Sequence, residues 1–158
     1  KGQGISAYDP RVIEVTGISM MLTAQGADHT SGNLPAFNCK DKTTDELVAA
    51  SLDIQALSAA ADSLGLCIFG RSVTNIKTEL IVGALNDAHG TKLDTSFMQT
   101  LGLETLRNEW AFNKQAGFTE KDDELPDFFY DEPLAPSNKA ARHRSAEVNR
   151  SMRGLLGA

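Results

Sequence analysis

Cysteine is scarce in this chain of 158 residues, which has only Cys39 and Cys67. Two cysteines are too few for a disulfide framework and are more usual in a reducing cytoplasm. Long apolar runs are lacking as well: none approaches the roughly 18 residues that a membrane helix needs, and no signal peptide is visible. These absences predict a cytoplasmic protein without a membrane segment.

Positive charge is also in short supply. The chain has 15 Lys and Arg against 21 Asp and Glu, for a formal net charge of −6, and its only basic cluster is at 139–144. The lack of a basic stripe argues against nucleic acid as a partner. No P-loop, G-x-S-x-G or H-E-x-x-H pattern appears. The hydrophobic share of 41% is enough for a core, so we expect one folded domain or one large piece of a longer protein.

Helix signals are frequent in the first half of the chain. Asp9 and Pro10 are typical of an N-cap and a first helical residue, and the apolar stripe after them continues towards Gly26. A second helix is expected from Thr43, which forms a capping box with Glu46, to a stop at Gly65. Between these helices, residues 26–42 have turn residues and little periodicity, which predicts a loop.

Two further helices are expected at about 75–88 and 94–115, and a short one at 146–156. The acidic, proline-containing stretch 119–139 predicts irregular structure. Strand alternation and internal repeats are not evident. The predicted fold class is therefore all-α.

Four short motifs then become specific: KGQGISAYDPR (1–11), GADHTSGN (26–33), DSLGLC (62–67) and the stretch from NEWAFNK to PDFF (108–129). Together and in this order they resemble the aldehyde ferredoxin oxidoreductase family of tungsten- and molybdenum-pterin enzymes, in its C-terminal α-helical region. The resemblance covers residues 1–134. The remaining residues, 135–158, are interpreted as a basic C-terminal tail with a possible short helix. Because the chain starts at Lys1 rather than at Met, we expect a fragment of a larger chain.

The resemblance implies that DSLGLC binds cofactors. It places Asp62, Leu66 and Ile68 against a pterin and makes Cys67 the fourth ligand of a 4Fe–4S cluster, whose other cysteines form an upstream C-x-x-C-x-x-x-C run that this chain lacks. The chemistry agrees, because a thiolate is the ligand that iron–sulfur clusters require and a carboxylate accepts hydrogen bonds from pterin N–H groups. In the alternative interpretation, Gly65 only stops a helix, Asp62 is a solvated acid and Cys67 is a small buried side chain.

The resemblance also implies a catalytic role for His29, in proton transfer or in hydrogen bonding to the metal's oxygen ligand or the substrate carbonyl. An imidazole suits this task because its pKa lies near working pH. Gln25 and Thr30 are expected to contact the cofactor, but Gln25 occupies a position held by Arg in some members, and without a charge it would hold a phosphate weakly or not at all. Without these motifs, a lone loop histidine such as His29 is usually a surface residue. His143 is expected to be solvated.

Tyr8 is the second catalytic candidate, because formaldehyde-type members have a tyrosine in the substrate pocket just before the first helix. The helix predicted between Tyr8 and His29, over residues 10–26, would if straight hold them roughly 24 Å apart. They could share a pocket only if this helix were short or broken, and Gly17 is a position where a break could occur.

The function implied is oxidation of an aldehyde to a carboxylic acid at a bis-pterin tungsten or molybdenum centre, with electrons passed through a 4Fe–4S cluster to ferredoxin. The expected partners are the upstream domains of the same polypeptide, ferredoxin and the aldehyde, with homo-oligomer formation possible. The isolated 158 residues should bind no cofactor and have no activity. Two alternatives stay open: a non-enzymatic helical interaction module, and a reductive reaction on the same scaffold.

Overall fold

The structure is a computed structural model, and it describes residues 1–157. Eight helical segments follow one another: α1 Glu14–Leu22, α2 Thr44–Ser63, the 3-10 turn η1 Ile68–Gly70, α3 Arg71–Thr74, α4 Thr78–His89, α5 Phe97–Gln115, α6 Phe128–Asp131 and α7 Ser145–Leu156. No β-strand occurs in these residues; Leu134 and Lys139 form an isolated bridge. The predicted all-α class is confirmed.

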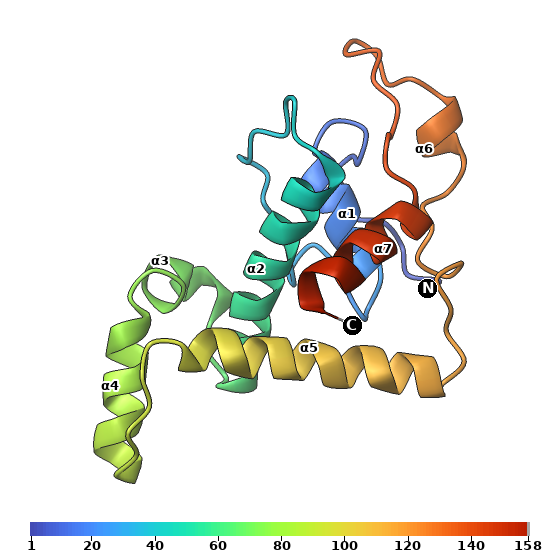
Figure 1. The fold of residues 1–158 in the computed structure, drawn as a ribbon. Coiled ribbons are helices and arrows are strands. Elements are labelled where there is room, and N and C mark those ends of the chain that lie inside the picture. The colour runs from blue at the N-terminus through green and yellow to red at the C-terminus, as the bar shows by residue number, and fades with distance from the viewer. Residues whose placement is uncertain (158) are drawn as a thin grey trace.

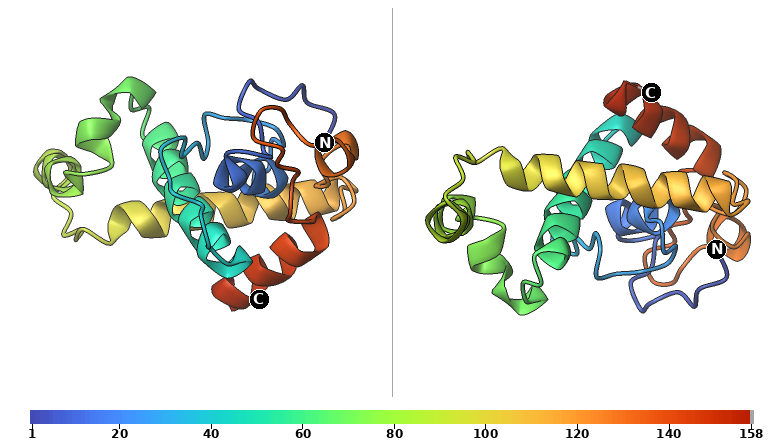
Figure 2. Two further views of the ribbon diagram at one scale, coloured as in Figure 1. Left: turned by 90° about the horizontal axis from the view of Figure 1, so that it is seen from above. Right: turned by 90° about the horizontal axis from the view of Figure 1, so that it is seen from below.

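Helix α2 stands at the centre and contacts α1, α5 and α7 (Figure 1). Seen from above and below, α1, α6 and α7 lie on one side of α2, α3 and α4 extend from the other, and α5 runs across both (Figure 2). The larger core surrounds α1 and the first half of α2. Its fully or almost fully buried apolar members are Val15, Ile18, Met21, Leu47, Val48 and Val148.

A second, smaller core lies where the C-terminal half of α2 meets α4 and α5, around Ala60, Val82 and Met98. Here α2 and α5 approach so closely that a Cβ atom at Gly102 would lie 1.8 Å from the carbonyl oxygen of Ala56. Glycine is therefore required at this crossing. The crossing fixes the end of α2 against α5.

The capping box predicted at the start of α2 is confirmed. The amide of Glu46 donates to Thr43 Oγ1 at 3.3 Å, and the amide of Thr43 donates to Glu46 Oε2 at 2.9 Å. These reciprocal bonds satisfy two of the amides that the first turn leaves free.

The predicted start of the first helix is wrong. Asp9 caps only a turn: its carboxylate accepts from the amide of Arg11 at 2.9 Å and from Nε and Nη2 of the same residue, and the amide of Ile13 donates to the Asp9 carbonyl oxygen. This pairing closes a turn, and α1 begins only at Glu14. Gly17 does not break α1 either; it lies inside the helix, where Pro10 packs so closely that a Cβ would be 2.6 Å from the proline Cβ.

His143 is buried, with 7% of its surface exposed, so the expected solvated side chain is wrong. Residues 145–156 form α7, which packs on α2 and buries Val148, and this folds the preceding basic segment against the core. His143 Nδ1 lies 3.1 Å from Thr44 Oγ1. Burial, followed by the charge of Arg142, lowers the pKa of His143 below its usual 6.5.

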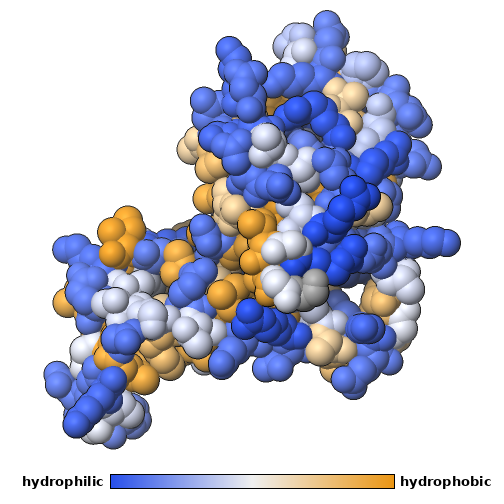
Figure 3. Space-filling view, in the orientation of Figure 1, coloured by the Kyte–Doolittle hydropathy of each residue, from blue (hydrophilic) through white to orange (hydrophobic). Residues whose placement is uncertain are grey.

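The segment from η1 to α4 leaves large apolar side chains on the surface: Phe69, Val73, Ile76 and Leu80. Apolar colour gathers on this projecting part of the molecule (Figure 3). No helix among residues 1–157 combines the length and hydrophobicity needed to cross a membrane.

Candidate functional site

The loop after α1 is shaped by a buried carboxylate. Asp28 accepts hydrogen bonds from the amide and hydroxyl of Thr30, at 2.8 and 2.7 Å, and from Ser31 Oγ at 2.6 Å. Burial opposes ionisation of Asp28, but these bonds outweigh it and hold the pKa below its usual value. The Thr30 hydroxyl proton is therefore engaged inside the loop. Asp28 was not among the predicted residues, although an acid just before His29 resembles an Asx-turn signal.

Tyr8 and His29 lie together at the surface of this loop. Their ring centroids are 5.5 Å apart and the rings are stacked, with an interplanar angle of 28°. The sequence allowed Tyr8 and His29 to share a pocket only if the helix between them were short or broken. It is short, because α1 has only nine residues, and loops on both sides bring its flanking segments back together. His29 is exposed and Tyr8 half-buried. One face of the imidazole is covered by the phenol, while its nitrogens remain accessible for proton transfer.

At its C-terminal end, α2 stops in a Schellman motif. Gly65 has φ +67°, its amide donates to Asp62 O at 3.0 Å, and the amide of Leu66 donates to Ala61 O at 2.8 Å. The chain then extends through Cys67 before η1 begins. The thiol of Cys67 is free and exposed, Asp62 is exposed, and Leu66 and Ile68 are half-buried. The interpretation of Cys67 as a small buried side chain is wrong.

Two contacts join the His29 loop to the end of α2. Gln25 and Asp62 line the same cavity, which has a volume of about 100 Å³. The Nη2 of Arg71, one turn beyond Cys67, donates to the carbonyl oxygen of Thr30 at 2.5 Å. The two motifs, some 35 positions apart in sequence, thus lie next to each other in the fold. Arg71 was missed by sequence reasoning and gave no signal there.

The residues fit a cofactor site in part. An exposed thiol on an extended segment can ligate iron, and an exposed carboxylate one turn before it can accept from N–H donors. A 4Fe–4S cluster needs four such ligands. Among residues 1–157, no group of three or more His, Cys, Asp and Glu is arranged to hold a metal ion.

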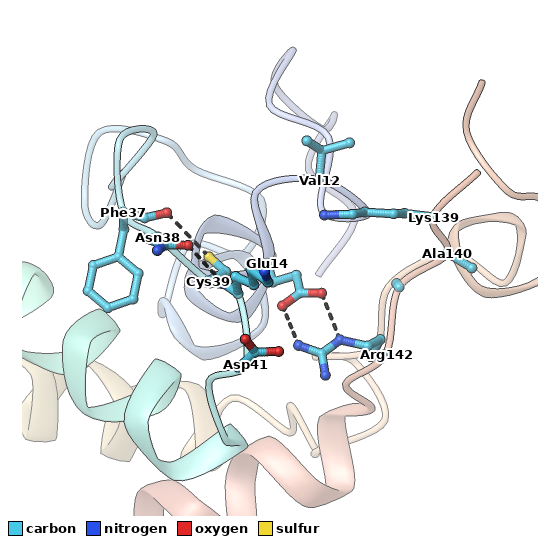
Figure 4. A pocket seen from close by; sticks show the side chains of 11 residues that line it. Val12, Glu14, Phe37, Asn38, Cys39, Asp41, Lys139, Ala140 and Arg142 are labelled. Atoms are coloured by element: carbon cyan, nitrogen blue, oxygen red, sulfur yellow. Dashed lines mark hydrogen bonds and ion pairs between the residues drawn. The ribbon is translucent and has the colours of Figure 1, made fainter. Parts of the chain in front are cut away.

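A separate open pocket of about 680 Å³ lies beside the start of α1 and contains none of the predicted site residues. Figure 4 shows Cys39 beside the Glu14–Arg142 ion pair in this pocket. Arg142 donates through Nε and Nη2 to Glu14 at 2.7 and 2.6 Å. Burial opposes ionisation of Glu14, but the bonds from Arg142 outweigh it and its pKa lies below the usual value. This pair joins the segment before α7 to α1.

His29, Asp62 at the glycine-terminated end of α2, and the free thiol of Cys67 lie in neighbouring segments of one helical domain. The sequence motifs implied this arrangement for a cofactor-binding domain. The family model described as aldehyde ferredoxin oxidoreductase, domains 2 and 3, matches residues 1–155. The chain therefore belongs to the aldehyde ferredoxin oxidoreductase family.

The curated relatives that the chain matches are described as tungsten-containing aldehyde ferredoxin oxidoreductases. The protein from Pyrococcus horikoshii is 30% identical over 143 residues, which is 85% of this chain and 23% of the relative. That from Thermococcus kodakarensis is 29% identical over 139 residues, or 82% of this chain and 23% of the relative. The chain thus spans about a quarter of the length of these relatives. No solved structure gives a significant match.

Proposed function

We propose that this chain is the part of a tungsten-pterin aldehyde oxidoreductase that supplies one face of the active site and the last ligand of its iron–sulfur cluster. The proposal is carried by the stacking of Tyr8 on His29 in a loop that adjoins the end of α2. In that loop, Gln25 lines a cavity with Asp62, and the carbonyl of Thr30 accepts from Arg71, four residues after Cys67. Molybdenum in place of tungsten is compatible with the same residues. The named relatives contain tungsten, which favours tungsten here.

In the proposed reaction, an aldehyde and water give a carboxylic acid, two protons and two electrons. The metal–pterin centre, when bound, supplies the two-electron oxidation. His29 takes up a proton or donates a hydrogen bond to the substrate carbonyl, and the Tyr8 ring fixes the plane of the imidazole. A 4Fe–4S cluster, held in part by Cys67, would when bound supply the one-electron path to ferredoxin.

Asp62, Leu66 and Ile68 are proposed to lie against the pterin, and Cys67 to bind iron. The remaining cysteine ligands are assigned to upstream domains of the same polypeptide, and the cytoplasm is the compartment proposed for the enzyme. Gln25 lies at the rim of the Asp62 cavity and offers an uncharged contact. For Thr30, whose hydroxyl proton is bound to Asp28, we propose a cofactor contact through the hydroxyl oxygen. The proposed boundary between domain and tail remains near residue 134.

The test is turnover of the natural-length protein, purified without oxygen, with His29→Gln and Tyr8→Phe. His29→Gln should lower kcat by about 10²-fold or more while tungsten and iron per polypeptide stay unchanged. Tyr8→Phe should keep the stacking ring and lower kcat by less than His29→Gln does. His89→Gln, which changes an exposed histidine at the end of α4, is the matched control. Wild-type turnover in His29→Gln would contradict the proposal.

A second candidate function is a helical interaction module, which the exposed apolar side chains between Phe69 and Leu80 favour. Self-association of the 158-residue chain, with no aldehyde oxidation by the natural-length protein, would support it. A reductive reaction at the same site remains the third possibility, and assays with a low-potential donor and a carboxylic acid would detect it.

A further inference from the structure

The small cavity shared by Gln25 and Asp62 contains a buried amide whose oxygen has no partner. Gln55 is fully buried and lines this cavity, and its Oε1 makes no hydrogen bond. An unpaired polar atom in this position costs about 1–3 kcal/mol, so it needs an explanation. The direction of the amide is fixed by its other end. Gln55 Nε2 donates to Ser51 Oγ at 2.9 Å, Ser51 Oγ lies 2.7 Å from Ser19 Oγ, and Ser19 donates to Gly32 O at 2.7 Å.

Because this chain of bonds ends on a carbonyl, both hydroxyl protons in it are committed, that of Ser19 to Gly32 O and that of Ser51 to Ser19. The amide nitrogen must point to Ser51, which leaves the Gln55 oxygen facing the cavity as an acceptor. The structure therefore presents a preformed lone pair in a space of about 100 Å³.

The other polar groups of the cavity wall are acceptors too. Its four hydroxyls donate their protons to other acceptors in the protein: Ser31 donates to Asp28 at 2.6 Å, and Ser63 donates to the carbonyl oxygen of Ala59 at 2.7 Å. The remaining two behave in the same way, with Thr105 donating to Leu101 at 2.9 Å and Thr23 donating to Gly26. Two carboxylates, Asp62 and Glu109, complete the lining. The side-chain donors of this lining are the amide of Gln25, which is exposed, and the second N–H of the Gln55 amide.

Glu109 and Asp62 repel one another across this space. Partial burial of the Glu109 carboxyl, followed by the charge of Asp62, raises the pKa of Glu109 above its usual value. An occupant with several N–H donors would satisfy the Gln55 oxygen and both carboxylates at once, because charge-assisted hydrogen bonds to carboxylates are the stronger kind. A second, open depression of about 390 Å³ adjoins the cavity at Gln25 and Glu109 and is lined by the exposed ring of Phe112.

We propose that Gln55 and Glu109, together with Asp62, bind the donor-rich aminopyrimidinone edge of the pterin. This inference rests on the proposed function, and it gives a binding role to Gln55, which lies outside the four motifs, and to Glu109, which lies in the fourth motif without an assigned role. The edge enters this cavity, where the hydroxyl, carboxylate and Gln55 oxygens accept its hydrogen bonds, and the rest of the cofactor lies outside. A flat ring with an amino group and ring N–H groups matches this wall, whereas a carboxylate or phosphate does not.

The experiment measures how fast pterin leaves the natural-length holoprotein, purified without oxygen, from the fluorescence of the oxidised pterin released on mild heating. Glu109→Gln should speed release about tenfold or more, because one charge-assisted acceptor becomes a neutral amide with its own donors. Gln55→Met keeps the length of the side chain, removes the buried acceptor and should also speed release. Glu104→Gln, an exposed acid earlier on α5 that does not line the cavity, is the matched control and should behave as wild type.

Asp62→Asn separates this inference from the proposed function. If Asp62→Asn speeds release and both Glu109→Gln and Gln55→Met do not, the inference is wrong while the proposed site stands. If Asp62→Asn also releases pterin at the wild-type rate, the pterin does not lie here and the proposed function loses its site. Melting temperatures of the cofactor-free variants serve as the second readout: faster release with an unchanged apo melting temperature supports direct binding. If Gln55→Met does not fold, Glu109→Gln decides the question, because its side chain is on the surface.

Discussion

Replacing Gly102 by alanine tests the packing that fixes the site. An added methyl group would lie 1.8 Å from the carbonyl oxygen of Ala56 and 2.5 Å from its carbonyl carbon. Both are backbone atoms of α2, so no side chain can rotate away. Ordinary contact begins near 3.4 Å, and α5 would therefore have to move by about 1.6 Å.

The magnitude follows from two opposing effects. Overpacking of this kind costs about 1–3 kcal/mol, and a backbone clash lies at the upper end of that range. Alanine recovers about 1 kcal/mol of helix propensity. We expect a net loss of about 2 kcal/mol, which in a domain of this size corresponds to a decrease of roughly 4–8 °C in melting temperature.

Gly83→Ala in α4 is the matched control, because a Cβ there meets no atom within 4 Å. This variant should be as stable as wild type or more stable by up to about 1 kcal/mol. The assay is urea unfolding followed by circular dichroism, supported by thermal melts. Equal stability of Gly102→Ala and Gly83→Ala would refute the close crossing of α2 and α5.

Two further predictions concern the stability of the chain. The pKa of His143 is lowered in the folded state, so the unfolded state takes up this proton first; stability should be full above about pH 6.5 and fall as the pH drops below it. In denaturant titrations, His143→Gln should remove this part of the pH dependence, whereas His89→Gln, at an exposed histidine, should keep it. If the free energy of unfolding depends on pH in the same way in both variants and in wild type, His143 is not the group responsible. Thr43→Ala removes the side-chain half of the capping box and should cost about 1 kcal/mol, with a loss below about 0.3 kcal/mol speaking against it.

The local signals of α2 were sufficient to predict it from sequence. Its cap is a reciprocal contact between two residues three positions apart, and its end is set by the backbone freedom of Gly65. Neither depends on the rest of the chain. The start of α1 could not be predicted in the same way, because the turn that Asp9 caps through the Arg11 amide ends at Ile13 and the helix begins only at Glu14.

In the candidate site, too, local motifs indicated the residues but not the contacts that depend on tertiary packing. His29, Asp62 and Cys67 were indicated by short motifs, and Tyr8 by its place before α1, but the 5.5 Å contact of Tyr8 with His29 depends on the length of α1 and on loops that carry no periodic signal. Gln55 appears on a helix as an ordinary polar residue. Only the packing of α1 and α5 on α2 buries it and leaves its oxygen unpaired.

His143 was misread for a related reason. In sequence it lies among basic residues and looks solvated, yet the ion pair between Arg142 and Glu14 draws the segment onto α1 and covers the imidazole. Contacts between residues more than a hundred positions apart decide its environment, and no local pattern records them.

The central claim is that the thiol just beyond the glycine-terminated end of α2 binds iron. The direct measurement is iron per polypeptide in the natural-length protein, purified without oxygen, compared between wild type, Cys67→Ser and Cys39→Ser. We predict about four iron atoms in wild type and in Cys39→Ser, whose sulfur lies in the separate pocket, and a large loss in Cys67→Ser. Full iron content in Cys67→Ser would contradict the claim.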